Sequence, residues 1–183
     1  MGKEDWNITE VLFDSRKIAA GADGETQLYV AQKGTQTDGH QYIPQVIAQG
    51  GRVIVCEDLP ETVDPEVTYV KVPDSSYALG VVASAFYDNP SRKLKLVGIT
   101  GTNGKTTTTW IAAAFIDADP ARKCGYVTTV EVCTGSRRFY TGYTTPPLAQ
   151  LKEIFAEMEA NGCTDCVMEV SSHAIHQHRT GDT

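Results

Sequence analysis

Short apolar runs alternate with amphipathic segments in the first half of the chain. Residues 53–56 and 67–70 are rich in β-branched side chains and are bounded by turn residues, a pattern typical of strands. Residues 42–49 predict a helix, because a proline falls in the first turn and two glycines follow the last. A second helix is expected to start after Asp74 or Ser75 as its cap. Its buried face would consist of Leu79, Val82 and Phe86.

The second half of the chain follows a regular order of strand, loop, helix and strand. Strands are expected at residues 96–99, 125–129 and 166–170. The helix after the first strand carries one apolar stripe made of Trp110, Ile111, Ala114, Phe115 and Ala118. A later helix is expected to start at Thr145 as its cap, with two prolines in the first turn, and to end at 161–162. Its face would be Leu148, Leu151, Ile154, Phe155 and Met158.

A polar connector at residues 88–92 separates the two halves. Strands that alternate with helices predict parallel sheets with helices on their faces. The fold class is therefore α/β, with a small N-terminal α/β domain at residues 1–90 and a parallel-sheet domain at 91–183. The strand–helix pattern stops without further units. We therefore expect the second domain to be incomplete and one apolar sheet edge to be exposed.

Composition and charge narrow the possible functions. The net charge is −7, and no local basic cluster offsets it, which argues against a nucleic-acid surface. The first ten residues are charged and lack an apolar core, so they do not resemble a signal peptide. No apolar run approaches the length of a membrane span. Five scattered cysteines suit a reducing cytoplasm better than a disulfide framework. We expect a cytoplasmic protein with no nucleic-acid or membrane partner.

The strongest chemical signal is the glycine-rich segment at residues 98–107, between an apolar strand and an amphipathic helix. Glycines let backbone N–H groups approach phosphates, and the helix N-terminus adds its positive end. Lys105 would reach the terminal phosphates of a nucleotide, and the Thr106 hydroxyl would bind Mg²⁺. The spacing departs from the common rule, because Ile99 stands five residues before Gly104 where a glycine is usual. The segment predicts a P-loop and hence an ATPase domain.

A second signal is Glu169, near the end of an expected buried strand. A carboxylate at the end of a parallel strand can point into the site and hold Mg²⁺ directly or through water. An acidic residue in such a place can also be a surface residue or a helix cap. The phosphate loop on a neighbouring strand favours the metal-binding interpretation.

Several motifs, in order along the chain, resemble the Mur ligase family. Residues 101–107, Gly-Thr-Asn-Gly-Lys-Thr-Thr, resemble the family's ATP loop. Residues 168–174, Met-Glu-Val-Ser-Ser-His-Ala, resemble a signature of the branch that adds the third residue of the peptidoglycan stem. Residues 14–16, 33–40 and 144–146 are similar to its uridine-side motif, its second loop and its substrate-contacting Thr-Thr-Pro. The resemblance runs from about residue 13 to residue 179.

The resemblance implies an ATP-dependent amide-bond ligase of peptidoglycan precursor synthesis. ATP would phosphorylate the D-glutamate side-chain carboxylate of UDP-MurNAc-L-Ala-D-Glu. The amine of a diamino acid, meso-diaminopimelate or L-lysine, would then attack the acyl phosphate. ATP and Mg²⁺ are the implied cofactors, and a monomer is expected. Residues 1–90 would bind UDP-MurNAc, residues 91–183 would be part of the central ATP-binding domain, and the C-terminal domain would be absent. This chain alone is not expected to turn over.

The resemblance also assigns roles residue by residue. The implied catalytic residues are Lys105, Glu169 and His173, and the implied metal ligands are Thr106 and Glu169. The implied ATP-binding residues are Gly101, Thr102, Asn103, Gly104, Lys105, Thr106 and Thr107. The implied substrate-binding residues are Phe13, Ser15, Thr35, Gln36, Thr37, Thr144, Thr145, Ser171, Gln177 and Arg179. Thr35 and Tyr143 depart from the pattern of some family members, which carry His and Asn there.

Other interpretations stay open. A non-catalytic module that binds a UDP-sugar or a nucleotide would use the same loops without turnover. An unrelated P-loop ATPase or kinase would share the loop but would not explain residues 14–16 or 169–173. Zinc binding by the three histidines at 173, 176 and 178 is not expected from their spacing. The Cys163/Cys166 pair lacks a partner pair, so we interpret these residues as ordinary thiols rather than as a redox or metal site.

Overall fold

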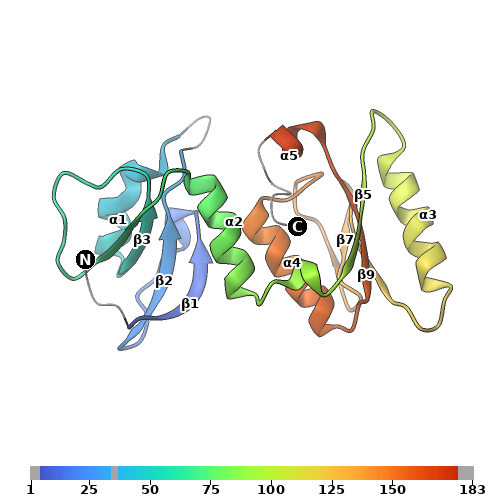
Figure 1. Cartoon of the computed structure of the whole chain (residues 1–183), viewed down its shortest axis with the longest axis horizontal. Helices are drawn as coiled ribbons and strands as arrows, with labels where there is room; N and C mark the ends of the chain where they lie inside the picture. The colour runs from blue at the N-terminus through green and yellow to red at the C-terminus, as the bar shows by residue number, and fades with distance from the viewer. Residues whose placement is uncertain (1–4, 34–36, 177–183) are drawn as a thin grey trace. The chain divides into compact units, whose positions relative to one another are not determined.

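The computed structural model describes residues 5–33 and 37–176, apart from the side chains of His173 and His176. The chain divides into two compact units, Met1–Val82 and Ala83–Thr183. The division lies inside a helix that precedes the expected boundary at residue 90 (Figure 1). Within the described residues, no helix combines the length and the apolar character that crossing a bilayer requires.

The first unit is built on a four-stranded parallel sheet with the order β1-β2-β3-β4 (Figure 1). The strands are β1 (Asn7–Leu12), β2 (Glu25–Val30), β3 (Val53–Cys56) and β4 (Thr68–Lys71). The helices are η1 (Ser15–Lys17), η2 (Gly39–Tyr42), α1 (Ile43–Ala48) and α2 (Ser75–Phe86). The predicted strands β3 and β4 and the predicted helices α1 and α2 are confirmed, whereas β1 and β2 were not predicted.

The core of the first unit lies between the sheet and its helices. It combines side chains from three of the strands with α1 and the loops: Leu12, Ile18, Tyr29, Ala31, Ile43, Val46, Ile54, Cys56 and Val67. The expected cap of α2 is confirmed, because Asp74 Oδ1 accepts the Tyr77 N–H at 2.9 Å. Its expected face is wrong at one end. Leu79 is buried, but Phe86 is 37% exposed and stacks edge-on against Tyr87.

The second unit is built on a five-stranded sheet with the order β5-β9-β6-β7-β8. The strands β5 (Lys95–Ile99), β9 (Asp165–Glu169) and β6 (Cys124–Val127) are parallel. The short strands β7 (Val132–Cys133) and β8 (Arg138–Phe139) add an antiparallel edge. The helical elements are η3 (Pro90–Arg92), α3 (Lys105–Asp117), α4 (Leu148–Ala160) and α5 (Ser172–His176). Figure 1 shows α3 and α4 on opposite faces of this sheet.

The two large helices of the second unit differ in how well their buried faces were predicted. All five residues expected on the face of α4 are buried. In α3 the expected stripe is wrong: Trp110, Ile111 and Phe115 are 39, 53 and 76% exposed. The residues that α3 buries are Thr109 and Ala113. Ala112 and Ile116 are partly buried against the same cluster as Ala113, whereas Trp110, Ile111 and Phe115 lie outside it.

Candidate functional site

The glycine-rich loop joins the end of β5 to the start of α3. Gly104 caps the helix with a φ of 78°, and Gly101 has a φ of 145°, so both positions favour glycine. Lys105 is the first residue of α3, and its Nζ donates to the Gly101 carbonyl at 2.8 Å. The loop therefore places a helix N-terminus and an ammonium group together, as a phosphate site requires.

Glu169 lies beside this loop at the end of β9. Its strand pairs with β5 in a register that sets Glu169 opposite Ile99. Its side chain is 1% exposed, and Oε1 accepts a hydrogen bond from the Thr106 hydroxyl at 2.7 Å. The interaction joins the two expected metal ligands directly, so the expectation that Glu169 points toward the loop is confirmed.

Thr129 is a site residue that the sequence did not single out. It follows β6, where its N–H donates to Glu169 Oε1 at 2.9 Å and its hydroxyl lies 3.1 Å from Oε2. The same hydroxyl lies 3.1 Å from the hydroxyl of Thr144. Thr129 therefore links the carboxylate to the expected substrate segment. The available signal was its place just after a strand that neighbours β9.

Thr145 does not cap α4 as expected, because Pro147 is the N-cap and forms no side-chain cap bond. The Thr145 hydroxyl instead donates to the backbone carbonyl of Glu169 at 2.9 Å and accepts from the N–H of Ser171 at 3.2 Å. The hydroxyl of Ser171 in turn accepts the N–H of Ala174 in α5. The structure thus brings three expected substrate residues, Thr144, Thr145 and Ser171, to the strand end that carries Glu169.

The oxygen donors at this strand end fit a hard divalent cation. Mg²⁺ prefers carboxylate, hydroxyl and water oxygens, and it is often bound through one carboxylate with phosphate oxygens. Thr106 and Glu169 supply a hydroxyl and a buried carboxylate that already touch. No described residue forms an ion pair with Glu169 within 4 Å, so its charge is not neutralised by the part of the chain that the structure describes.

The expected uridine-side residues lie in the first unit. Phe13 is 38% exposed and follows β1, and Ser15 is buried in η1. Asp14 caps this turn and forms a two-pronged ion pair with Arg16, which lowers the pKa of the Asp14 carboxyl. Thr37 is exposed. The expected contacts of Thr35, Gln36, Gln177 and Arg179, and of the side chain of His173, lie outside the described residues.

The Cys163/Cys166 pair, expected as core or surface thiols, lies in the core. Both are free and buried, and burial raises the pKa of each thiol. A raised pKa disfavours the reactive thiolate. Among the described side chains, no group of three or more His, Cys, Asp and Glu residues could hold a metal ion.

Comparisons with known proteins point to one family. A family model described as "Mur ligase family, catalytic domain" matches residues 7–87, and one described as "Mur ligase middle domain" matches residues 99–183. A protein of Cytophaga hutchinsonii named UDP-N-acetylmuramoyl-L-alanyl-D-glutamate–2,6-diaminopimelate ligase is 44% identical over 97% of this chain and 36% of its own length. One of the same name from Phocaeicola vulgatus is 42% identical over 99% of this chain and 36% of its own length.

A solved structure of a ligase with that name shares the fold. Its TM-score is 0.74 at 22% identity, and the match covers 96% of this chain and 34% of that protein. The chain thus spans about a third of the length of the relatives it matches. The phosphate loop, the acidic strand end and these matches agree, and the chain belongs to the Mur ligase family.

Proposed function

We propose that this chain supplies the UDP-precursor and ATP sites of a ligase that joins a diamino acid to UDP-MurNAc-L-Ala-D-Glu. The observation that carries the proposal is the 2.7 Å contact between the phosphate-loop hydroxyl of Thr106 and the buried carboxylate of Glu169. The proposal takes meso-diaminopimelate rather than lysine as the amino acid, since the relatives of 42–44% identity are named diaminopimelate ligases. Monomeric state and cytoplasmic location remain predictions.

In this proposal the chain's own residues mainly position charged groups. The α3 N-terminus and the Lys105 ammonium bind the phosphates of ATP and offset the negative charge that develops as the terminal phosphoryl group moves. Thr106 and Glu169 would hold Mg²⁺, which neutralises phosphate charge when it is bound. Thr129 keeps the Glu169 carboxylate in place through two donors.

The acceptor carboxylate would be activated by phosphoryl transfer, because phosphate supplies the leaving group that a free carboxylate lacks. Thr144, Thr145 and Ser171 lie at the strand end of Glu169, where they can orient the dipeptide part of the precursor. Phe13, Ser15 and Thr37 are proposed to contact its uridine diphosphate part. His173, Thr35, Gln36, Gln177 and Arg179 keep the roles that the family resemblance implies.

A second candidate function is binding without turnover. It is favoured by one fact, that the chain spans about a third of the length of its relatives. A ligase needs three substrates held together, and the proposal assigns sites in this chain to two of them. We expect this chain to bind ligands and to form no amide by itself, which a radiolabelled diaminopimelate assay would check.

Calorimetric titration tests the proposal most directly. The chain is titrated with UDP-MurNAc-L-Ala-D-Glu and, separately, with Mg²⁺-ATP. Lys105→Ala should weaken ATP binding about 10- to 100-fold, because hydrogen bonds to charged groups contribute about 1.5–3 kcal/mol. Precursor binding should not change. Lys17→Ala, in the other unit, is the matched control. A folded chain that binds neither ligand would refute the proposal.

A further inference from the structure

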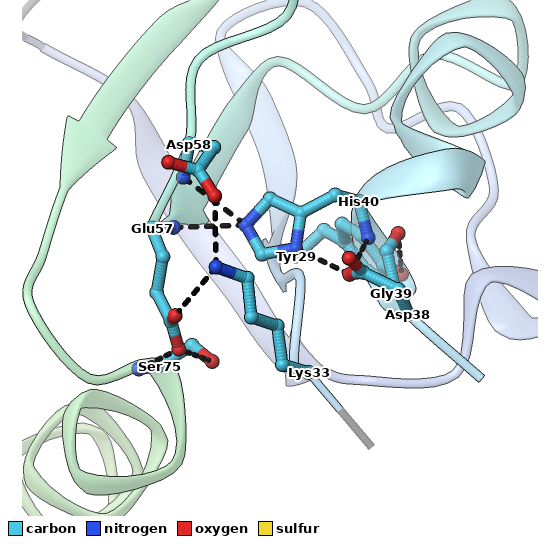
Figure 2. Close-up of polar contacts among 8 residues, drawn as sticks. All are labelled: Tyr29, Lys33, Asp38, Gly39, His40, Glu57, Asp58 and Ser75. Atoms are coloured by element: carbon cyan, nitrogen blue, oxygen red, sulfur yellow. Dashed lines mark hydrogen bonds and ion pairs between the residues drawn. The ribbon is translucent and has the colours of Figure 1, made fainter. Parts of the chain in front are cut away.

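A cluster of polar side chains in the first unit has no role in the proposed function so far. It joins the segment after β2 to the turn after β3 and to the start of α2 (Figure 2). Both strands are parallel, so both segments leave the sheet at the edge formed by the carboxyl ends of its strands, where ligands of open α/β sheets bind. The members are Tyr29, Lys33, Asp38, Gly39, His40, Glu57, Asp58 and Ser75.

The imidazole of His40 connects two separate loops. Its Nδ1 lies 2.6 Å from Asp38 Oδ1, within the same loop. Its Nε2 accepts the backbone N–H groups of Glu57 at 2.9 Å and Asp58 at 3.3 Å (Figure 2). A backbone N–H can only donate, so the partners assign the lone pair to Nε2 and the proton to Nδ1. His40 therefore binds as a neutral imidazole of one tautomer, and its side chain is 12% exposed.

The same turn is also bound from the other end of the loop. Lys33 Nζ lies 2.8 Å from Asp58 Oδ2 and 3.1 Å from Glu57 Oε2. Glu57 Oε1 accepts the backbone N–H and the hydroxyl of Ser75 at 3.0 and 2.7 Å, which fixes the carboxylate that Lys33 contacts. The loop ends thus converge on one turn, since Lys33 also pairs with Asp38 as an isolated antiparallel bridge.

Two further bonds hold the backbone next to His40. The Gly39 N–H donates to the Gln32 carbonyl at 2.7 Å, and the Tyr29 hydroxyl donates to the Gly39 carbonyl at 3.1 Å. Tyr29 is almost fully buried in β2. These bonds fix the backbone at Gly39. The side chain of His40 determines how this backbone sits against the turn after β3.

We propose that His40 is a positioning residue for the UDP end of the precursor. Its two ring nitrogens link Asp38 to the backbone of the Glu57–Asp58 turn. This link also positions Thr37, the exposed residue next to Asp38. The inference rests on the proposed function, because Thr37 is one of its substrate residues. His40 does not touch substrate in this account; it sets the place of a residue that does.

Two substitutions separate the contact of His40 with Asp38 from its contacts with the Glu57–Asp58 turn. In His40→Gln, the side-chain oxygen can take the place of Nε2 and still accept from Glu57 and Asp58. In His40→Asn, the shorter amide can still donate to Asp38 but cannot reach the turn after β3. We expect His40→Asn to weaken precursor binding about tenfold, as the loss of one or two hydrogen bonds would. His40→Gln should stay within about threefold of the unmodified chain, because it keeps the bonds to the turn and its backbone N–H still donates to Asp38 Oδ1.

Calorimetric titration of both variants of the full chain measures these affinities, and Mg²⁺-ATP affinity is the internal control. Unchanged ATP binding with weakened precursor binding in His40→Asn alone supports the proposal. Equal precursor affinity in His40→Asn and the unmodified chain overturns it and leaves the proposed function intact. A parallel loss of both affinities, with a lower melting temperature in both variants, assigns His40 a purely structural role and also overturns it. A folded unmodified chain that binds no precursor refutes the proposed precursor site and this inference together.

Nitrogen-15 NMR of the ligand-free chain gives a readout that needs no substrate. The inferred tautomer predicts a protonated Nδ1 and an unprotonated Nε2. It also predicts slow amide exchange at Glu57 and Asp58, which becomes faster in His40→Asn and not in His40→Gln. The opposite tautomer would overturn the proposal even if the precursor binds.

Discussion

Glu57 and Glu169 are two carboxylates in similar places with different surroundings. Glu57 directly follows β3, and Glu169 ends β9, so each lies at the carboxyl end of a parallel strand. Each accepts a backbone N–H and a hydroxyl, from Ser75 and from Thr129 respectively. Glu57 also has its own cation, Lys33 at 3.1 Å. Among the described residues, no cation lies within ion-pair distance of Glu169.

The difference separates a structural carboxylate from one that can receive a metal ion. Hydrogen bonds from the Ser75 N–H and hydroxyl, together with Lys33, lower the pKa of Glu57 to about 2. The negative charge of Glu57 pairs with Lys33, and this ion pair joins the turn after β3 to the segment after β2. Glu169 is oriented by threonines, which donate hydrogen bonds without adding positive charge. A buried carboxylate held in this way stays available for an external cation.

Removal of the Glu169 charge should have the largest effect. Glu169→Gln keeps the shape of the side chain but removes the negative charge that would hold Mg²⁺. We expect Mg²⁺-ATP affinity to fall by about 100-fold or more, since loss of even an outer-shell partner costs about 10–100-fold in metal affinity. ATP binding without Mg²⁺ should change little. Calorimetric titration with and without Mg²⁺ measures both.

Glu153→Gln is the matched control for this change, because Glu153 is an exposed residue of α4. It removes one negative charge from the same unit without touching the loop. Equal Mg²⁺-ATP affinities of Glu169→Gln and Glu153→Gln would show that Glu169 does not hold the metal.

A smaller effect is expected when Glu169 keeps its charge but loses a donor. Thr129→Val is close in shape and removes the hydroxyl 3.1 Å from Oε2, while the backbone N–H still donates to Oε1. We expect Mg²⁺-ATP affinity to fall about tenfold, as for other residues that orient a metal ligand. Thr129→Ser retains the hydroxyl and should bind like the unmodified chain. If Thr129→Val and Thr129→Ser bind Mg²⁺-ATP with equal affinity, the Thr129 hydroxyl does not orient Glu169.

Periodicity predicted the fold best where large apolar side chains are buried. The face of α4 carries five such residues in helical spacing, and all are buried. The same rule failed for α3, because this helix meets the sheet through Thr109 and Ala113 and leaves Trp110 exposed. β2 was missed for a related reason. It begins Glu-Thr-Gln, and these polar residues hide a strand whose last three residues are buried.

The candidate site was predictable to the extent that its chemistry is local in sequence. The phosphate loop is one continuous segment, and Glu169 was inferred from its place at a strand end. The roles of Thr129 and His40 were not predicted, because each depends on a contact between residues distant in the chain. The Nε2 atom of His40 meets the backbone of residues 57 and 58, and backbone N–H groups carry no sequence signature.

The smallest expected effect concerns the pH dependence of the first unit. A carboxyl whose pKa is lowered by folding stabilises the protein above its unfolded pKa, near 4.5, and this contribution is lost as the pH falls toward about 2. Ser75→Ala removes the hydroxyl donor to Glu57 and keeps the N–H donor, so the pKa should rise only part of the way. Carbon-13 NMR titration of the Glu57 carboxyl measures this shift. Ser76→Ala is the control, because Ser76 is an exposed neighbour whose hydroxyl accepts a hydrogen bond from Gln32. If the Glu57 carboxyl titrates alike in Ser75→Ala and Ser76→Ala, the Ser75 N–H and Lys33 alone account for its low pKa. The Ser75 hydroxyl would then not act on Glu57 as the Thr129 hydroxyl is proposed to act on Glu169.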